Sequence, residues 1–283
     1  MKMRIINTDI IAKTVEELFI DANYKLPQSV TSSIESAARQ EKDPLAKDIL
    51  DKLLLNCNAS QEMNVPICQD TGMAVVFLEI GQGVVLEGES LEKAVNNGVK
   101  SAYEKGYMRK SVVSDPLFAR SNTDDNTPAI IHTKIVDGDK VRITAVPKGF
   151  GSENMSAIRM FTPSACADDI TEFVKNTVIS AGSNPCPPIV VGVGIGGDFE
   201  MCALLSKIAL CRDLDDRNKN ENYAKLEKQI LDEINKSGIG PQGFGGKATA
   251  LAVNIEYFPT HIAGLPCAVN IGCHVTRHKS AVI

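Results

Sequence analysis

One stretch of the chain predicts β structure more clearly than any other. From Pro128 to Val146 it reads "PAIIHTKIV", then "DGD", then "KVRITAV". Both flanking segments are rich in β-branched residues, and Asp137, Gly138 and Asp139 between them are typical turn residues. The pattern predicts a β-hairpin with this tripeptide as its turn, and therefore antiparallel strands near the middle of the chain.

Strand and helix patterns alternate along the rest of the sequence. Strand candidates are "MAVVFLEI", "IVVGVGIGG", "ATALAVNIEYF" and "CAVNIG". Apolar residues three and four apart predict helices at about 90–106, 163–180, 199–211 and 222–237. The first 60 residues read as helices, with Asn7 or Thr8 capping the first. We expect a mixed α/β (α+β) fold in a single domain, 1–283, with a helical N-terminal region followed by mixed sheets flanked by helices.

Composition excludes several classes of protein. The 283 residues are 43% hydrophobic and carry a net charge of -5, which disfavours a nucleic-acid or anionic-membrane partner. No run of about 20 apolar residues is present, and the N-terminus becomes acidic before any signal-peptide core appears. Eight cysteines without a Cys-x-x-Cys pair argue against zinc ribbons and thioredoxin-like sites. We therefore expect a cytoplasmic protein whose metal site, if any, gathers distant ligands.

The segment "PICQDTGMAV" places chemically active groups directly before a predicted strand. Cys68, Gln69, Asp70 and Thr71 are consecutive, and Gly72 closes the group. Glycine permits a backbone conformation that other residues avoid, so this loop has a defined shape. Cys68 is a candidate metal ligand and Asp70 a candidate for proton transfer. The alternative is a capped turn with a buried structural cysteine.

A second candidate thiol lies in "NPCPP". Prolines on both sides of Cys186 restrict the backbone and hold the thiol on a stiff, non-helical loop where a strand begins. Such a position suits a preorganised metal ligand. A purely structural turn is the alternative.

The C-terminal segment "HIAGLPCAVNIGCHVTRH" contains three of the four histidines in the chain. Alternation in "CAVNIGC" predicts a strand, in which Cys267 and Cys273 would lie about 20 Å apart. Both can therefore serve one small site only if the strand ends between them. Gly272 favours such an end, so Cys273 is the better ligand candidate.

The glycines of "GVGIGG" invite a nucleotide-binding interpretation, which their spacing does not support. They do not match G-x-G-x-x-G, and the chain has no Walker motif. We expect these glycines to let the backbone approach a cluster or a small anion.

Taken together, these motifs resemble those of the class I, iron–sulfur fumarate hydratases. The likeness is to the alpha subunit or N-terminal domain and covers nearly the whole chain. Its markers are "CQDTG", "PKGFGSENMS", "NPCPP…GVGIGG", "GIGPQGFGG" and "HIAGLPCAVNIGCHVTRH". The L-tartrate dehydratase alpha subunit is a close relative that shares several of them. The resemblance implies the fold type of this iron–sulfur hydro-lyase subunit.

The same resemblance implies a cofactor and a set of site residues. A [4Fe–4S] cluster with one open iron would be held by Cys68, Cys186 and Cys273. Asp70 would be the catalytic residue of this chain. The implied substrate-binding residues are Gln69, Arg109, Gly151 and His261.

The implied activity is the reversible hydration of fumarate to L-malate, a step of the tricarboxylic acid cycle. The resemblance places the catalytic base on a fumarate hydratase beta subunit, in a heterodimer or an alpha2beta2 heterotetramer. One alternative is the alpha subunit of L-tartrate dehydratase, which converts tartrate to oxaloacetate. Another is an iron–sulfur redox or sensing module, which would require a fourth ligand such as Cys267.

Overall fold

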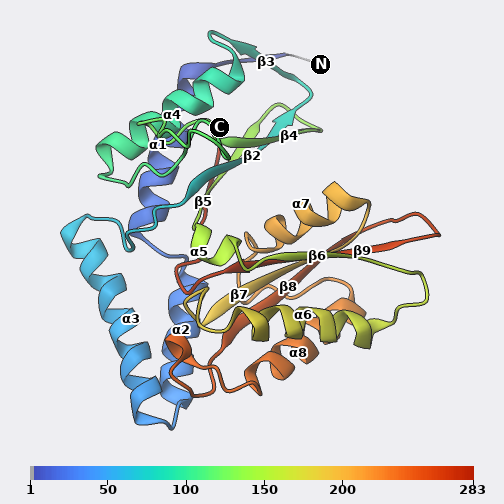
Figure 1. The fold of residues 1–283 in the computed structure, drawn as a ribbon. Coiled ribbons are helices and arrows are strands. Elements are labelled where there is room, and N and C mark those ends of the chain that lie inside the picture. The colour runs from blue at the N-terminus through green and yellow to red at the C-terminus, as the bar shows by residue number, and fades with distance from the viewer. Residues whose placement is uncertain (1–2) are drawn as a thin grey trace. The chain divides into compact units, whose positions relative to one another are not determined.

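The computed structural model describes residues 3–283, which form two compact units (Figure 1). Unit 1 contains the chain up to Pro27, Cys57–Gly149 and Arg277–Ile283. Unit 2 contains Gln28–Asn56 and Phe150–Thr276. Helix α3 (Pro44–Met63) carries the chain from unit 2 into unit 1. The mixed α/β fold class is confirmed, and one catalytic domain made of both units stays a prediction.

Unit 1 is a four-stranded sheet packed against two helices. Its strands run in the order β10-β5-β2-β4, and β1 and β3 form a separate parallel pair. The elements are β1 (Arg4–Asn7), α1 (Thr8–Tyr24), β2 (Met73–Gly81), β3 (Val84–Glu87), α4 (Leu91–Lys105), β4 (Ile130–Val136), β5 (Val141–Lys148) and β10 (Lys279–Val282).

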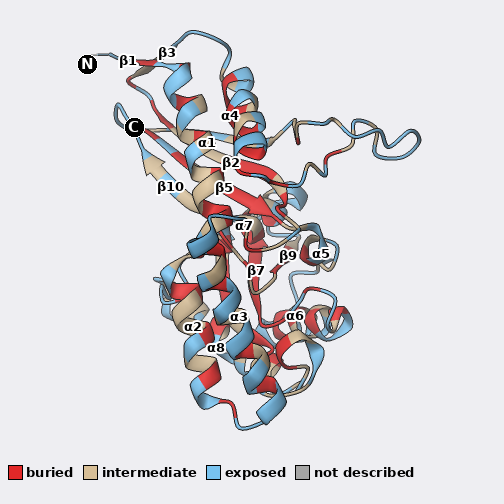
Figure 2. Ribbon diagram, turned by 90° about the vertical axis from the view of Figure 1, so that its left-hand side faces the viewer, coloured by how far each residue is buried: buried red, intermediate tan, exposed pale blue. Residues whose placement is uncertain are grey.

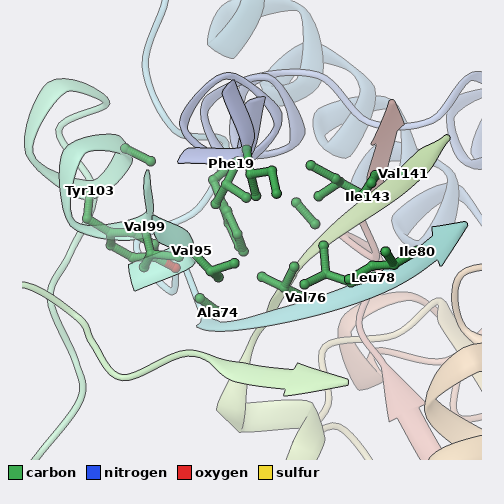
Figure 3. Packing of buried hydrophobic residues seen from close by; sticks show 14 of the residues in the cluster. Phe19, Ala74, Val76, Leu78, Ile80, Val95, Val99, Tyr103, Val141 and Ile143 are labelled. Carbon is green, nitrogen blue, oxygen red and sulfur yellow. The ribbon is translucent and has the colours of Figure 1, made fainter. Parts of the chain in front are cut away.

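The core of unit 1 lies between these helices and strands β2 and β5. Phe19 of α1, Val76 and Leu78 of β2 are buried and point toward one another (Figure 3). The Asn7 side chain caps α1 by accepting a hydrogen bond from the Asp9 amide, so Asn7 is the cap of the two residues that the sequence offered. The helix predicted at 90–106 is confirmed as α4.

The predicted hairpin between the strands at 130–136 and 141–148 is wrong. Strand β2 lies between them, parallel to β4 and antiparallel to β5. Residues 137–140 cross the end of β2 instead, where the Gly81 amide donates to the Lys140 carbonyl at 2.8 Å. The turn residues correctly indicated a reversal of the chain. They could not indicate that a largely buried strand from elsewhere in the sequence pairs with both arms.

Unit 2 contains a second four-stranded sheet in the order β6-β9-β7-β8. β7 pairs in parallel with β8 and antiparallel with β9, and β9 pairs antiparallel with β6. The remaining elements are α2 (Gln28–Gln40), α5 (Phe150–Glu153), β6 (Ala157–Phe161), α6 (Ala167–Ala181), β7 (Ile189–Gly196), α7 (Phe199–Ala209), α8 (Glu221–Asn235), a 3-10 turn η1 (Pro241–Gly243), β8 (Ala250–Phe258) and β9 (Leu265–Gly272). Edge strand β6 lies in a segment for which the sequence predicted no strand.

Strand β7 is buried along all eight residues. Helices α6 and α8 lie on one side of its sheet and α7 on the other (Figure 1). This buried strand is labelled within unit 2 in the ribbon coloured by burial (Figure 2). Burial on both faces explains the continuous apolar run in the sequence.

Two glycines of β7 are required by helix packing. A Cβ on Gly192 would lie 2.1 Å from the Ser206 carbonyl oxygen, and one on Gly194 would lie 2.0 Å from that of Cys202. Both carbonyl oxygens belong to α7, so the backbone of this helix packs directly against the backbone of β7. The expectation that these glycines admit a cluster or anion is wrong for Gly192 and Gly194. Among residues 3–283, no helix has the length and apolar character needed to cross a membrane.

Gly194→Ala should destabilise the protein by about 3 kcal/mol, because the added methyl group overlaps the backbone of α7. Equilibrium denaturation measured by circular dichroism will report this loss. Gly264→Ala is the matched control, since nothing lies within 4 Å of a Cβ built there. Equal stability of the two variants would show that α7 does not pack on β7 as described.

Candidate functional site

The "CQDTG" segment of unit 1 forms a tight turn between α3 and β2. The Asp70 amide lies 3.4 Å from Cys68 Sγ, and the Gly72 amide donates to Asp70 Oδ1 at 3.1 Å. Gly72 has a φ of +81°, and a Cβ there would lie 2.7 Å from the Lys148 amide nitrogen. Only glycine fits this position, which fixes the conformation of the turn.

Buried polar side chains hold this turn by donating hydrogen bonds to its backbone carbonyls. Tyr103 Oη lies 2.8 Å from the Thr71 carbonyl and 2.7 Å from the Gly72 carbonyl, to which its hydroxyl donates. Asn126 Nδ2 also donates to the Gly72 carbonyl, at 3.3 Å. Burial raises the pKa of Tyr103, which keeps the hydroxyl a neutral donor. Tyr103 and Asn126 lie far from the turn in the sequence, and neither belongs to a motif that predicted this contact.

A buried arginine contacts the same turn. Arg277 Nη2 donates to the Asp70 carbonyl at 2.6 Å, although only 4% of Arg277 is exposed. A buried guanidinium is tolerated only where hydrogen bonds and charge stabilise it. Arg277 therefore helps to set the position of Asp70, a role that the sequence did not reveal.

Arg109 is tied to this turn through its backbone. Thr71 Oγ1 donates to the Arg109 carbonyl at 2.9 Å, while the Arg109 side chain is exposed. Gly149 lies beside Asp70, because a Cβ on it would be 3.1 Å from Asp70 Oδ2. Gln69 is exposed next to Cys68. Unit 1 therefore gathers four of the predicted site residues, which are Cys68, Gln69, Asp70 and Arg109.

Unit 2 brings two of the predicted ligand cysteines to neighbouring backbone positions. Cys186 has a φ of +56°, unusual for a residue other than glycine. Its carbonyl accepts from the His274 amide at 3.3 Å and lies 3.0 Å from His274 Nδ1. Because His274 follows Cys273 directly, the two cysteines lie on adjoining loops. β9 ends at Gly272, as predicted, so Cys273 lies just outside the strand.

The loop "GIGPQGFGG" supports the Cys186 loop. The amide of Gln242 donates to the Pro187 carbonyl at 2.8 Å, and its side-chain Nε2 donates to the same oxygen at 2.6 Å. Gln242 Nε2 also lies 3.3 Å from His274 Nδ1. Gln242 therefore links the loops of Cys186 and Cys273, which the sequence did not predict.

Gly151 and His261 lie at different ends of unit 2. Gly151 is close to the Cys186 loop, because a Cβ on it would be 3.9 Å from the Asn184 carbonyl. His261 lies in the turn between β8 and β9, where Thr260 Oγ1 donates to the Gly197 carbonyl at 2.8 Å. This is the end of the sheet where β7 finishes, whereas Cys186 precedes its start. Within unit 2, the structure therefore does not bring His261 to Cys186 or Cys273.

Three of the other cysteines differ from the predicted ligands in their burial. Cys57, Cys202 and Cys267 are buried, whereas Cys186 is exposed and Cys68 and Cys273 are half-buried. Burial raises the pKa of Cys57 to about 11 and that of Cys267 to about 12. In neither unit does a set of three His, Cys, Asp or Glu side chains form a metal site by itself, within residues 3–283.

The chemistry of the exposed and half-buried thiols fits an iron–sulfur cluster, which requires accessible thiolates. Cys186 and Cys273 lie on adjoining loops that hydrogen bonds hold together. Cys267 does not fit, because it is fully buried within β9. Cys166 is exposed at the start of α6, and the family resemblance gives it no role.

Comparison with known proteins decides the family. The sequence model of the fumarate hydratase (Fumerase) family matches residues 12–282. The chain belongs to this family.

Its relatives include alpha subunits of another hydro-lyase. A protein of Methanocaldococcus jannaschii, provisionally named L(+)-tartrate dehydratase subunit alpha, is 40% identical over 272 residues, covering 94% of this chain and 95% of that protein. The L(+)-tartrate dehydratase subunit alpha of Escherichia coli strain K12 is 29% identical over 261 residues, covering 92% and 86%. The Shigella sonnei protein of that name has the same identity and coverage. These findings support a hydro-lyase and confirm the resemblance seen in the motifs.

Exposed cysteines should be alkylated faster than buried ones. At pH 8, iodoacetamide should alkylate Cys166 and Cys186 rapidly and Cys57 and Cys267 slowly. The thiolate reacts, and a rise in the pKa of Cys57 from 9.0 to about 11 lowers its thiolate fraction about 100-fold. Mass spectrometry of peptides over time measures each rate, with urea-unfolded protein as control. Equal rates in the folded protein would contradict this division.

Proposed function

We propose that this chain is the cluster-bearing subunit of a hydro-lyase for small 2-hydroxydicarboxylates, with L(+)-tartrate as the first candidate substrate. One observation carries the proposal: Cys186 and Cys273 lie on adjoining loops that hydrogen bonds connect. The chain belongs to this family and also contains the "CQDTG" turn. The names of the relatives support tartrate, whereas the motifs alone favoured fumarate.

The proposed cofactor is a [4Fe–4S] cluster held by Cys68, Cys186 and Cys273. Three protein ligands leave one iron able to act as a Lewis acid toward the substrate hydroxyl. The burial of Cys267 speaks against a fourth thiolate from β9, and therefore against a redox module with four cysteine ligands.

Residues of unit 1 would bind the substrate and move a proton. Asp70 has its carboxylate beside Gly149 and its backbone held by Arg277, so its position is set before substrate arrives. We assign Asp70 the protonation of the departing hydroxyl, which leaves as water. The exposed Arg109 guanidinium would pair with a substrate carboxylate through two parallel hydrogen bonds. Gln69 would donate a further hydrogen bond.

Fumarate and L-malate form the second candidate pair, supported by the description of the family. In either reaction a proton leaves one carbon and hydroxyl leaves the next, so water is lost and a double bond forms. Tartrate gives an enol that becomes oxaloacetate, and malate gives fumarate. Both substrates are four-carbon dicarboxylates with a hydroxyl on the carbon next to a carboxylate, and tartrate carries a second hydroxyl.

The catalytic base would come from a partner beta subunit. The relatives are named as alpha subunits, which supports a second chain. Gly151, near the Cys186 loop, would donate a hydrogen bond from its amide to the substrate. Because the substrate is a dianion, its two carboxylates need more positive charge than Arg109 alone provides. We propose a heterodimer or an alpha2beta2 assembly in the cytoplasm.

The test is a substrate comparison with the anaerobically reconstituted complex of this chain and its beta subunit. Dehydration of L(+)-tartrate, with oxaloacetate measured by a coupled dehydrogenase, should exceed dehydration of L-malate by at least about 10-fold in kcat/KM. A higher value for L-malate or for the hydration of fumarate would select the second candidate. No turnover of either acid would reject the proposed function.

Asp70→Asn supplies the matched variant for this assay. It should lower kcat about 100-fold or more, because an amide cannot deliver the proton, while iron content stays unchanged. Normal turnover would show that Asp70 only shapes its turn.

A further inference from the structure

A charged side chain follows the proposed substrate contact of Gly151 closely in the chain. Glu153 ends helix α5, two residues after Gly151. Lys207 Nζ of α7 donates to Glu153 Oε1 at 2.6 Å, and Asn270 Nδ2 of β9 donates to Glu153 Oε2 at 2.9 Å. Each carboxylate oxygen therefore has its own donor, one from a helix and one from a strand. A single helical turn is tied in this way to two larger elements of unit 2.

A serine extends this network to the end of β9. Ser156 Oγ accepts hydrogen bonds from Asn270 Nδ2 at 3.1 Å and from the Ile271 amide at 3.2 Å. The strand ends one residue after Ile271, and Cys273 follows. The network therefore joins the segment of α5 to the strand end from which Cys273 emerges.

The packing of α7 on the sheet explains why these side chains meet. Asn270 pairs with Gly192 of β7, and a Cβ on Gly192 would lie 2.1 Å from the Ser206 carbonyl oxygen of α7. Cross-strand partners point to the same face of a sheet, so Asn270 lies on the face that α7 covers. Lys207 is the next residue of that helix. The missing side chain at Gly192 thus lets α7 bring this lysine close to the sheet.

The network is largely shielded from water. Only 5% of Asn270 is exposed, and the side chains of Lys207 and Glu153 are 17% and 25% exposed. Little water competes for these hydrogen bonds, so they hold the carboxylate more firmly than a surface ion pair would. A helix of four residues has little stability of its own. The orientation of α5 therefore depends on such contacts with the rest of unit 2.

The fold itself does not require a glycine at position 151. Gly151 is exposed, and among the described residues a Cβ on it would meet only the Asn184 carbonyl oxygen, at 3.9 Å. This is an ordinary van der Waals contact, unlike the overlaps at Gly192 and Gly194. The space beside this backbone is therefore open to a ligand, which can approach a glycine closely.

We infer that Glu153 is a positioning residue, whose carboxylate fixes the Gly151 amide for binding a substrate carboxylate. The inference rests on the proposed function, because the substrate contact of Gly151 belongs to it. Lys207 and Asn270 hold the carboxylate of Glu153, which acts through the backbone of α5 and does not touch the substrate. An ion pair that only stabilised the fold would leave substrate binding unchanged, so the two roles can be separated by experiment.

Glu153→Gln tests the inference in the anaerobically reconstituted complex with the beta subunit. Glutamine keeps the size of the side chain but replaces one acceptor oxygen with a donor, so Lys207 or Asn270 loses its acceptor. KM for the acid that the wild type dehydrates should rise about 10-fold, while kcat changes less than about 3-fold. This split is expected because the amide contact is equally strong in the bound substrate and in the transition state.

Variants of the lysine show whether it acts through the same contact. Lys207→Met should raise KM about as much as Glu153→Gln, and the double variant should be no worse than either single one. Lys207→Arg should keep KM within about 3-fold of the wild type, because it preserves the charge and a donor. Additive increases in KM would overturn the proposed chain of contacts.

The matched control is an ion pair of the same length on the surface. Lys236 Nζ lies 2.6 Å from Glu233 Oε1, with the lysine side chain 70% exposed. Glu233→Gln should leave KM and kcat unchanged. Iron content equal to that of the wild type, measured for every variant, shows that the cluster is retained.

Hydrogen exchange tests the position of α5 without turnover or cofactor. The amides of Asn154, Met155 and Ser156 donate to carbonyls of residues 150–153, so this segment is hydrogen-bonded. In the complex without the cluster, Glu153→Gln should speed exchange in a peptide spanning 150–156 about 10-fold, while a peptide from β7 stays unchanged. Mass spectrometry measures both peptides, and Glu233→Gln is again the control.

The two measurements separate the inference from the proposed function. Unchanged exchange in Glu153→Gln would overturn the inference, whatever the substrate proves to be. Faster exchange with unchanged KM would also overturn it, because Glu153 would then only stabilise its segment. Absence of turnover in the wild-type complex would reject the proposed function, and with it the substrate role of Gly151.

Discussion

The fully buried strand β7 is the constraint on which the site in unit 2 depends. Helices on both faces and strands on both edges leave β7 no freedom to shift. Its antiparallel pairing with β9 sets Gly272 opposite Val190, so Cys273 emerges where β7 begins. The loop that contains Cys186 leads into β7 at the same place, and the Cys186 carbonyl contacts His274. Sheet register therefore brings the two thiols to adjoining loops, and it sends His261 to the far end.

A different principle positions the turn in unit 1. The backbone carbonyls of "CQDTG" point into the protein, where Tyr103, Asn126 and Arg277 satisfy them. Buried carbonyls without partners would cost about 1–3 kcal/mol each, so these contacts hold the turn in one conformation. The proposed roles of Cys68 and Asp70 depend on this anchoring, because other residues hold the backbone that carries them.

The sequence predicted what depends on local pattern and missed what depends on distant partners. Helix α4 follows from its apolar spacing with Ser90 and Gly106 at its ends, and the end of β9 follows from Gly272. The hairpin at 130–148 failed because β2 inserts between its arms. The hydrogen bond from Arg277 to the Asp70 carbonyl connects residues 207 positions apart, so no local pattern reveals it.

The same distinction applies to function. Motifs identified Cys186 and Cys273 and the family, but the position of His261 follows only from strand direction and register. Helix α7 likewise explains Gly192 and Gly194, which the sequence alone left open to a ligand interpretation. The motifs therefore predicted which residues form the site, while the sheet determined which residues of unit 2 lie close together.

The central claim is that Cys68, Cys186 and Cys273 hold an iron–sulfur cluster. Its most direct test is the iron and acid-labile sulfide content of anaerobically reconstituted protein. The wild-type chain and Cys267→Ser should each bind about four irons, whereas Cys68→Ser, Cys186→Ser and Cys273→Ser should fail to hold an intact cluster. Loss of the cluster in Cys267→Ser together with its retention in Cys273→Ser would contradict the account.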